Sequence, residues 1–239
     1  TYNAVEPTVC IVPDDYLYIQ HALDTCLNGD VIVIKPGTYT GFGNRDIDFK
    51  RKAITIRSID PNDSNVVAAT IIDCNATKDD RHRAFSFIRG EDPNSALGGL
   101  TIVRAYAPQT PYTQGRRDNS GGAIVCIGSS PTIRNCTFRN CYAPDSGGAA
   151  FFKDSSPNIV QCMFSQNSAE YAGALYCDSS VAKLLDCTFV GNYSELDGGA
   201  LILYSSEDTV VDRCKFTANI AARYAGALGV CYSRLYGET

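Results

Sequence analysis

Residues 187–201 read CTFVGNYSELDGGAL, and this stretch decides the fold because the chain repeats it. Related copies lie at 136–150 (CTFRNCYAPDSGGAA), 162–175 (CMFSQNSAEYAGAL) and 214–228 (CKFTANIAARYAGAL). The first cysteines of the four copies are separated by 26, 25 and 27 residues. A fixed period in the twenties is typical of a solenoid, in which each repeat buries its apolar face against its neighbours.

Each repeat contains short apolar runs separated by turn residues. Residues 123–126 (AIVC) alternate, residues 128–131 (GSSP) interrupt, and residues 133–138 (IRNCTF) resume. No 3.6-residue period appears, so the runs predict strands joined by tight turns rather than by helices. Two or three such strands in about 25 residues make one coil of a parallel β-helix, in which equivalent residues stack at about 4.8 Å.

The repeated residues predict ladders along the axis of the stack. Cysteine and phenylalanine lie two positions apart and therefore point to the same side, which we take to be the interior. The expected core ladder comprises Cys136, Cys162, Cys187 and Cys214 with Phe138, Phe164, Phe189 and Phe216. Asn167, Asn192 and Asn219 are expected to adopt left-handed turn geometry and to bond to one another between coils. The glycines of the Gly-Gly-Ala motif provide a bend without an obstructing Cβ.

The N-terminal half follows the same pattern less regularly. Strands are expected at 30–34, 53–58, 69–73 and 84–88, which gives roughly eight coils in total. Residues 14–29 (DDYLYIQHALDTCLNG) have helical apolar spacing, so we expect a helix capped by Asp14 or Asp15 that covers the first coil. A disulfide between Cys10 and Cys26 could fix this cap. The predicted organisation is a cap over residues 1–29 and one β-helix over 30–239, with regular repeats from 120.

Composition limits the functional class. A net charge of −5 gives no reason to expect binding to nucleic acid, and no apolar run approaches the roughly 20 residues of a membrane-spanning helix. Eleven cysteines favour an oxidising compartment, although four of them share a repeat position that also suits small core residues. The chain begins without Met, so we expect a processed, secreted or cell-surface product.

The motifs resemble those of known extracellular β-helix proteins. Residues 18–41 (YIQHALDTCLNGDVIVIKPGTYTG) look like the opening of pectin-lyase-like right-handed β-helices. GGAI, GGAA and GGAL at 121, 147 and 198, with FSQN, FVGN and FTAN at 164, 189 and 216, resemble the repeats of chlamydial polymorphic outer membrane proteins. SSPTI, SSPNI and ITIRSIDPNDSNVVAATIIDC look like secreted repeat proteins of planctomycete-like bacteria. The resemblance covers 14–231 and implies a right-handed parallel β-helix, a fold that hosts lyases, hydrolases, adhesins and structural fibres.

A catalytic site of the pectate-lyase kind would need carboxylates that hold Ca²⁺ and a nearby base. The richest charged stretch is KDDRHR at 78–83, and the candidate calcium ligands are Asp79, Asp80, Glu91 and Asp92. A solvated loop explains the same residues, and His82 in such a loop is a weak general-base candidate. We therefore assign no catalytic residue, and Ca²⁺ is the only cofactor considered.

Outward aromatic residues give the best candidate for a partner surface. Phe151, Tyr176, Tyr171 and Tyr224 could form a stripe that stacks on sugars or contacts a protein, and ordinary edge packing is the alternative. Arg116 and Arg117, in an expected loop over 108–119, could contact an anionic glycan or simply be solvated. Sequons permit glycosylation at Asn62, Asn75 and Asn192.

These observations predict an all-β, right-handed parallel β-helix of about eight coils with a short N-terminal helix. The predicted function is a non-enzymatic extracellular structural or adhesive role. No cap is apparent for the C-terminal strand edges, so we expect head-to-tail self-association or a longer β-helix. The alternative is an extracellular polysaccharide lyase or a glycan-binding module.

Overall fold

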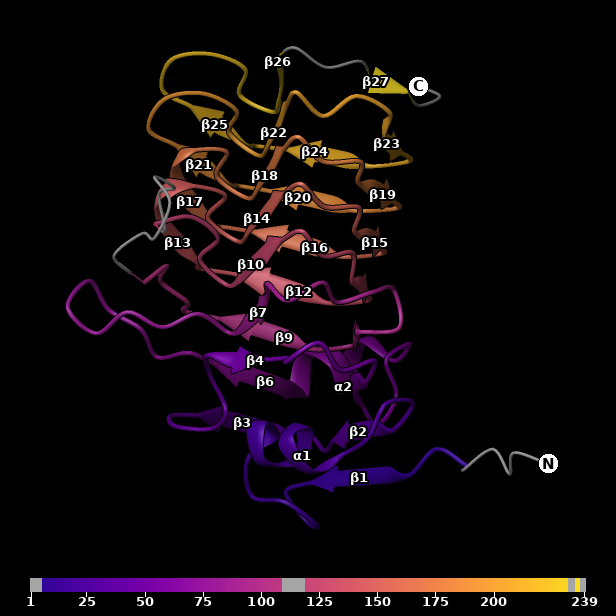
Figure 1. The fold of residues 1–239 in the computed structure, drawn as a ribbon. Coiled ribbons are helices and arrows are strands. Elements are labelled where there is room, and N and C mark those ends of the chain that lie inside the picture. The colour runs from indigo at the N-terminus through magenta and orange to yellow at the C-terminus, as the bar shows by residue number, and fades with distance from the viewer. Residues whose placement is uncertain (1–5, 109–118, 232–234, 237–239) are drawn as a thin grey trace.

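A computed structural model describes residues 6–108, 119–231 and 235–236. The chain winds into a stack of coils, with its N-terminal residues at one end and its C-terminal residues at the other (Figure 1). Neighbouring coils pair in parallel, as between β10 (Ile124–Ile127) and β14 (Ala150–Lys153) or β12 (Thr137–Arg139) and β16 (Met163–Ser165). The stack has about eight turns and very little helix, which confirms the predicted fold class.

The coils build four sheets along the stack. Sheet A has the order β1 (Val9–Val12), β2 (Val31–Ile34), β5 (Thr55–Ser58), β8 (Ala96–Gly98), β11 (Thr132–Arg134), β15 (Asn158–Val160), β19 (Lys183–Leu185), β23 (Thr209–Asp212) and β27 (Leu235–Tyr236). Sheet B contains β3 (Gly37–Thr40), β6 (Thr70–Asp73), β9 (Thr101–Val103), β12 (Thr137–Arg139), β16 (Met163–Ser165), β20 (Thr188–Val190) and β24 (Lys215–Thr217). Sheet C contains β4 (Ile47–Asp48), β7 (Phe85–Phe87), β10 (Ile124–Ile127), β14 (Ala150–Lys153), β18 (Leu175–Asp178), β22 (Leu201–Tyr204) and β26 (Leu228–Cys231). The shorter sheet D contains β13 (Tyr142–Ser146), β17 (Ser168–Tyr171), β21 (Tyr193–Ser194) and β25 (Ile220–Ala221).

The interior holds the expected ladders. Successive rings of Phe138, Phe164, Phe189 and Phe216 are stacked, with centroids 5.1, 4.9 and 4.7 Å apart. The cysteines of the same motif point inward beside them, and the first three are almost fully buried. The regular repeat therefore produces one continuous apolar column.

The turns differ from the prediction in one respect. Asn167, Asn192 and Asn219 do bond between coils, with Nδ2 of Asn167 donating to Oδ1 of Asn192 at 3.0 Å and Nδ2 of Asn192 donating to Oδ1 of Asn219 at 2.8 Å. The left-handed conformation, however, belongs to the residue before each asparagine, as at Gln166 (φ 54°) and Ala218 (φ 53°). The asparagine side chain is then free to turn inward and satisfy backbone groups of adjacent coils.

The two glycine positions of the Gly-Gly-Ala motif have different steric requirements. Its first position takes positive φ and tolerates alanine, since Ala172 adopts φ 53° there. Its second position excludes any side chain, because a Cβ on Gly148 would lie 2.3 Å from the carbonyl oxygen of Gly173. The second glycine is therefore required by the close approach of neighbouring coils.

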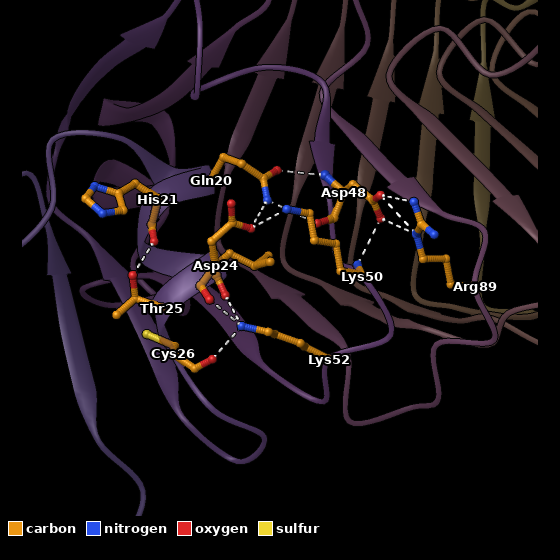
Figure 2. A network of polar contacts seen from close by, with 10 residues as sticks. Gln20, His21, Asp24, Thr25, Cys26, Asp48, Lys50, Lys52 and Arg89 are labelled. Carbon is orange, nitrogen blue, oxygen red and sulfur yellow. Dashed lines mark hydrogen bonds and ion pairs between the residues drawn. The ribbon is translucent and has the colours of Figure 1, made fainter.

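Helix α1 (Ile19–Thr25) covers the first coil with buried Ile19, Ala22 and Leu23. The predicted caps are wrong: the helix begins at Ile19 after Tyr18, and Asp15 instead accepts a bond from the Ile11 backbone within a preceding turn. The other end of the helix is capped from a distance, because Nζ of Lys52 donates to the carbonyl oxygens of Leu23, Asp24 and Cys26. Figure 2 shows this contact and the adjoining polar network.

The sequence did not predict the second helix, α2 (Ser64–Ala69), which precedes β6. Asp63 caps it by accepting a hydrogen bond from the backbone of Asn65. Among the described residues, neither helix has the length and apolarity needed to cross a membrane.

Candidate functional site

A groove of about 680 Å³ follows the outward face of sheet B, and we call it the lateral groove. Helix α2 lies beside β6 and β9 and forms one wall (Figure 1). Strands β9, β12 and β16 and the turns that flank them supply the floor. The lining residues are Pro61, Asn62, Ser64, Val67, Ala68, Thr101, Asn135, Cys136, Thr137, Arg139, Gln161, Met163, Ser165 and Gln166.

Hydrogen bonds hold the helical wall against the sheet. Nδ2 of Asn135 donates to the carbonyl oxygen of Pro61 and to Oδ1 of Asn62, both at 2.9 Å. Oγ1 of Thr101 donates to the carbonyl oxygen of Val67 at 2.8 Å. The groove is thus a fixed feature of the fold, which lowers the entropic cost of ligand binding.

The polar lining of the lateral groove is mostly uncharged. Asn135 and Gln161 occupy the same left-handed turn position in successive coils, with φ of 54° and 53°, so their side chains recur at about the 4.8 Å spacing of the strands. Asn62 and Gln166 add two further amides, and Arg139 is the only charged side chain in the lining. Amides can both donate to and accept from hydroxyl groups, while an arginine can bind a carboxylate.

Two of the buried cysteines, Cys162 and Cys177, are not suited to covalent catalysis. Burial raises the pKa of Cys162 well above its ordinary value and raises that of Cys177 to about 12. A nucleophilic cysteine needs a lowered pKa and exposure. These thiols are neutral core residues.

The predicted aromatic surface is divided between two columns. Phe151 and Tyr176 are half-buried neighbours on sheet C, with ring centroids 5.8 Å apart, and burial raises the pKa of Tyr176. Tyr224 is 69% exposed, and the guanidinium of Arg223 lies over its ring at 5.5 Å. Tyr171 is half-buried at the end of β17. Arg116 and Arg117 lie outside the described residues.

The four predicted calcium ligands have separate structural roles or remain apart. Glu91 is only 2% exposed, and its carboxylate accepts from the backbone of Arg51 and Arg89 and from Oγ of Ser129, each at 2.9 Å. Asp92 accepts from the backbone of Asn94, and Asp79 is an exposed loop residue. Within the described ranges, no group of three or more His, Cys, Asp or Glu residues could hold a metal ion. Calcium binding by these residues stays a prediction without geometric support.

His82 bridges two carboxylates. Its Nδ1 lies 2.5 Å from Oδ2 of Asp46, and its Nε2 lies 2.9 Å from Oδ1 of Asp80. Each ring nitrogen of His82 therefore faces a carboxylate oxygen within hydrogen-bonding distance. The hydrogen bond from His82 also lowers the pKa of Asp80. His82 therefore links two loops, and these contacts occupy both of its ring nitrogens.

Cys10 and Cys26 are brought together as the sequence suggested. Their Sγ atoms lie 2.7 Å apart in the buried cap, and both residues are free thiols in this structure. Disulfide formation therefore stays a prediction.

The predicted glycosylation sites have unequal access. Asn62 and Asn75 are exposed. Asn192 is fully buried, and its Nδ2 donates to the carbonyl oxygen of Phe164 as well as to Asn219. The Asn192 prediction is corrected on this basis, because a glycan on that nitrogen has no space in the folded protein.

Sequence reasoning missed the residues of the lateral groove. Asn135, Arg139, Gln161 and Gln166 were not among the candidate site residues that the sequence indicated. The signal that could have found them is their outward position on the same side of consecutive coils.

Comparison with known proteins gives the following likenesses. A family model described as the right-handed β-helix region matches residues 62–231. ORF18 of Geobacillus virus E2 is 13% identical, with a TM-score of 0.41, over 95% of this chain and 59% of its own chain. The pectin methylesterase from Aspergillus niger is 13% identical, with a TM-score of 0.30, over 98% of this chain and 87% of its own. This chain thus spans about 59% of the length of the viral protein. No curated protein matches the sequence.

Proposed function

The chain belongs to the right-handed β-helix family, and we propose that it is a non-catalytic extracellular scaffold that binds an acidic glycan along the lateral groove. The observation that carries this proposal is the lining of the groove. It offers amide and hydroxyl groups on successive coils and a single cation, Arg139. Such a surface suits a polymer with many hydroxyl groups and occasional carboxylates. An extracellular location is part of the proposal, because polymeric glycans of this kind lie outside cells.

A lyase is the less supported alternative. Pectate-lyase chemistry needs carboxylates that hold Ca²⁺ beside the substrate and a base close to the proton that it removes. The residues that line the lateral groove include no Asp, Glu or His. The groove can therefore supply binding contacts. Its lining has no carboxylate that could hold Ca²⁺ beside Arg139.

The first test is retention of the protein on immobilised polygalacturonate compared with a neutral glucan. We expect wild-type protein to bind polygalacturonate more tightly, and Arg139→Gln to weaken this binding by about tenfold, the value of one charge-assisted hydrogen bond. Lys183→Gln is the matched control, because Lys183 is an exposed cation on β19 of sheet A and does not line the groove.

Two results would count against the proposal. Equal binding of wild type and Arg139→Gln to polygalacturonate would show that the lateral groove is not the binding site. Release of unsaturated product from polygalacturonate in the presence of Ca²⁺, detected by ultraviolet absorbance, would favour the lyase.

End-to-end association is a second candidate function, favoured by the last described coil. Core residues that are buried in earlier coils become half-exposed there, including Cys214, Phe216 and Leu228. Strands β24, β25 and β26 each pair on one side only among the described residues. A second copy could extend these sheets. Negative-stain electron microscopy at low and high concentration tests this: regular filaments are expected, and isolated short rods at both concentrations would contradict it.

A further inference from the structure

A second cavity lies at the N-terminal end of the stack, between α1 and the loop that follows β3. Its volume is about 360 Å³, near the lower end of the roughly 300–1,000 Å³ typical of small-molecule sites. One wall comes from Tyr18, Gln20, His21 and Asp24, and the other from the 42–46 loop with His82. No lining residue is shared with the lateral groove. The cavity is therefore independent of the function proposed above, and we call it the cap cavity.

The two walls of the cap cavity are joined directly. The backbone N–H of Gln20 donates to the carbonyl oxygen of Gly43 at 2.8 Å, and that of Ile19 donates to Oδ1 of Asn44 at 3.1 Å. Gly43 has φ +79°, and a Cβ on it would lie 2.8 Å from the Cβ of Tyr18. Because the loop packs this closely on the start of the helix, the cavity is preformed.

Aromatic rings stand at the opening of the cap cavity. Phe42 is 92% exposed and Tyr18 is 44% exposed, and both line the cavity. The 42–46 loop leaves the Phe42 ring exposed to solvent, so this ring does not contribute to the core. A flat apolar ring beside polar groups is suited to the C–H face of a sugar.

The charged groups around the cap cavity are paired. Asp24 lies beside Lys50, Asp80 beside Arg45, and Asp46 beside His82. A charged ligand would be repelled by the groups of its own sign, and the groups of opposite sign already have partners. The cavity therefore favours a neutral ligand.

Two polar groups in the lining remain available to a ligand. Oδ1 of Asp24 accepts from Gln20 and Lys50 (Figure 2), while Oδ2 has no hydrogen-bond partner within the described part of the chain. The His21 ring contacts the edge of the Tyr16 ring at 5.2 Å, and its nitrogens likewise have no hydrogen-bond partner among the described residues. The two residues lie three positions apart on α1 and hence on the same side. A carboxylate oxygen accepts a hydrogen bond from a hydroxyl group, and an imidazole nitrogen can donate to or accept from another.

We propose that the cap cavity binds a neutral sugar residue, which stacks on Phe42 and bonds through its hydroxyl groups to Asp24 and His21. The ligand class follows from three features on the same site: an exposed aromatic ring, paired charged groups and unpaired polar atoms. One sugar unit, such as the end of a neutral glycan, fits the volume.

Saturation-transfer difference NMR with maltose, cellobiose and lactose as probes tests the proposal on the full chain. We expect at least one of these neutral disaccharides to bind, and Phe42→Ala to weaken its binding by about tenfold. Phe42→Tyr keeps the ring and should retain binding. Tyr224→Ala is the matched control, because it removes a similarly exposed ring at the opposite end of the stack.

The charge argument has its own test. In the Arg139→Gln variant, where the lateral groove has lost its cation, galacturonate and glucosamine should bind more weakly than the neutral probe. Asp24→Asn leaves Lys50 without its carboxylate partner and should shift the preference toward galacturonate. Thermal unfolding of each variant establishes that it is folded.

The proposal is overturned if no neutral disaccharide binds folded wild-type protein, if Phe42→Ala binds as tightly as wild type, or if glucosamine binds best. Arg139→Gln should leave binding of the neutral disaccharide unchanged, and Phe42→Ala should leave retention on polygalacturonate unchanged. Failure of the lateral groove and failure of the cap cavity are thereby distinguishable.

Discussion

The coils from residue 120 onward and the coils before it satisfy their backbone polar groups by different means. In the later coils one residue type recurs: backbone N–H groups of Ser129, Ser155 and Ser180 each donate to the serine Oγ of the following coil. In the earlier coils, single charged side chains take over. Glu91 ends the serine ladder, and Lys52 caps α1. In the repeated coils, one kind of side chain satisfies equivalent backbone groups. Each irregular segment instead needs a separate polar side chain.

This difference explains where the cavities lie. The lateral groove needs α2, which interrupts the path between β5 and β6, and the cap cavity needs α1 and the 42–46 loop. None of these elements belongs to the regular repeat. The ladders therefore stabilise the stack, and the irregular insertions create the places where a ligand fits.

The largest effect is expected at Glu91, where the two regions meet. Glu91→Gln replaces one accepting oxygen with an amide that faces donors, and should lower the free energy of unfolding by about 3 kcal/mol, as for a buried charged group that loses partners. Urea denaturation measures this. Glu207→Gln is the control because Glu207 is exposed. Similar losses in the two variants would show that the serine ladder does not depend on the carboxylate.

A smaller effect is expected from Lys52→Met, which keeps most of the side-chain length and removes the ammonium group. Three carbonyl oxygens at the end of α1 lose their donor, so the free energy of unfolding should fall by about 2 kcal/mol. Hydrogen exchange should show faster opening of α1 than of the later coils. Lys183→Met, at an exposed position on β19, is the control and should have little effect.

The members of the asparagine ladder in the regular coils should contribute unequally to the free energy of unfolding. Asn192→Ala removes a fully buried amide between two coils, while Asn219→Ala removes a half-buried one in the last described coil. We expect a loss of about 2 kcal/mol at Asn192 and about half of that at Asn219. Thermal unfolding of the pair measures the ratio. A larger loss at Asn219 would contradict the idea that burial between coils sets the strength of the ladder.

The contrast between regions also accounts for what sequence could predict. The phenylalanine stack and the strands were predictable because each coil repeats the same residues at the same depth. The second helix was not, because Asp63 and the residues after it form an insertion that no other coil repeats. The pairing of His82 with Asp46 was also hidden, since 36 residues separate them and only the coil path brings them together.

The candidate sites were the least predictable part for a related reason. Outward side chains vary from coil to coil, so Arg139 and Gln161 carry no repeat signal, whereas their inward neighbours do. Phe42 stands alone in a polar loop, and its relation to His21 depends on how Gly43 packs against Tyr18. The alternation of residues along a strand predicts which side chains face water. The shape of a cavity depends on how the insertions pack, which the sequence pattern does not show.

The smallest effect concerns an ion pair on the outside of the regular coils. The hydrogen bond from Arg223 lowers the pKa of Asp197 from its ordinary value of 3.8. Because the folded pKa lies below the unfolded one, the pair contributes stability above the unfolded pKa and loses it as pH falls through the folded pKa. The contribution is small, since the Arg223 side chain is about half exposed and well solvated. Denaturation of wild type and Arg223→Gln should therefore differ slightly at neutral pH and converge as the pH falls below the ordinary Asp value of 3.8. Lys215→Gln, which alters an exposed cation on β24, should show no such convergence. A difference that persists in acid would mean that Arg223 acts mainly by packing over Tyr224, and the outer surface of the repeats would then contribute through apolar contact, as their interior does.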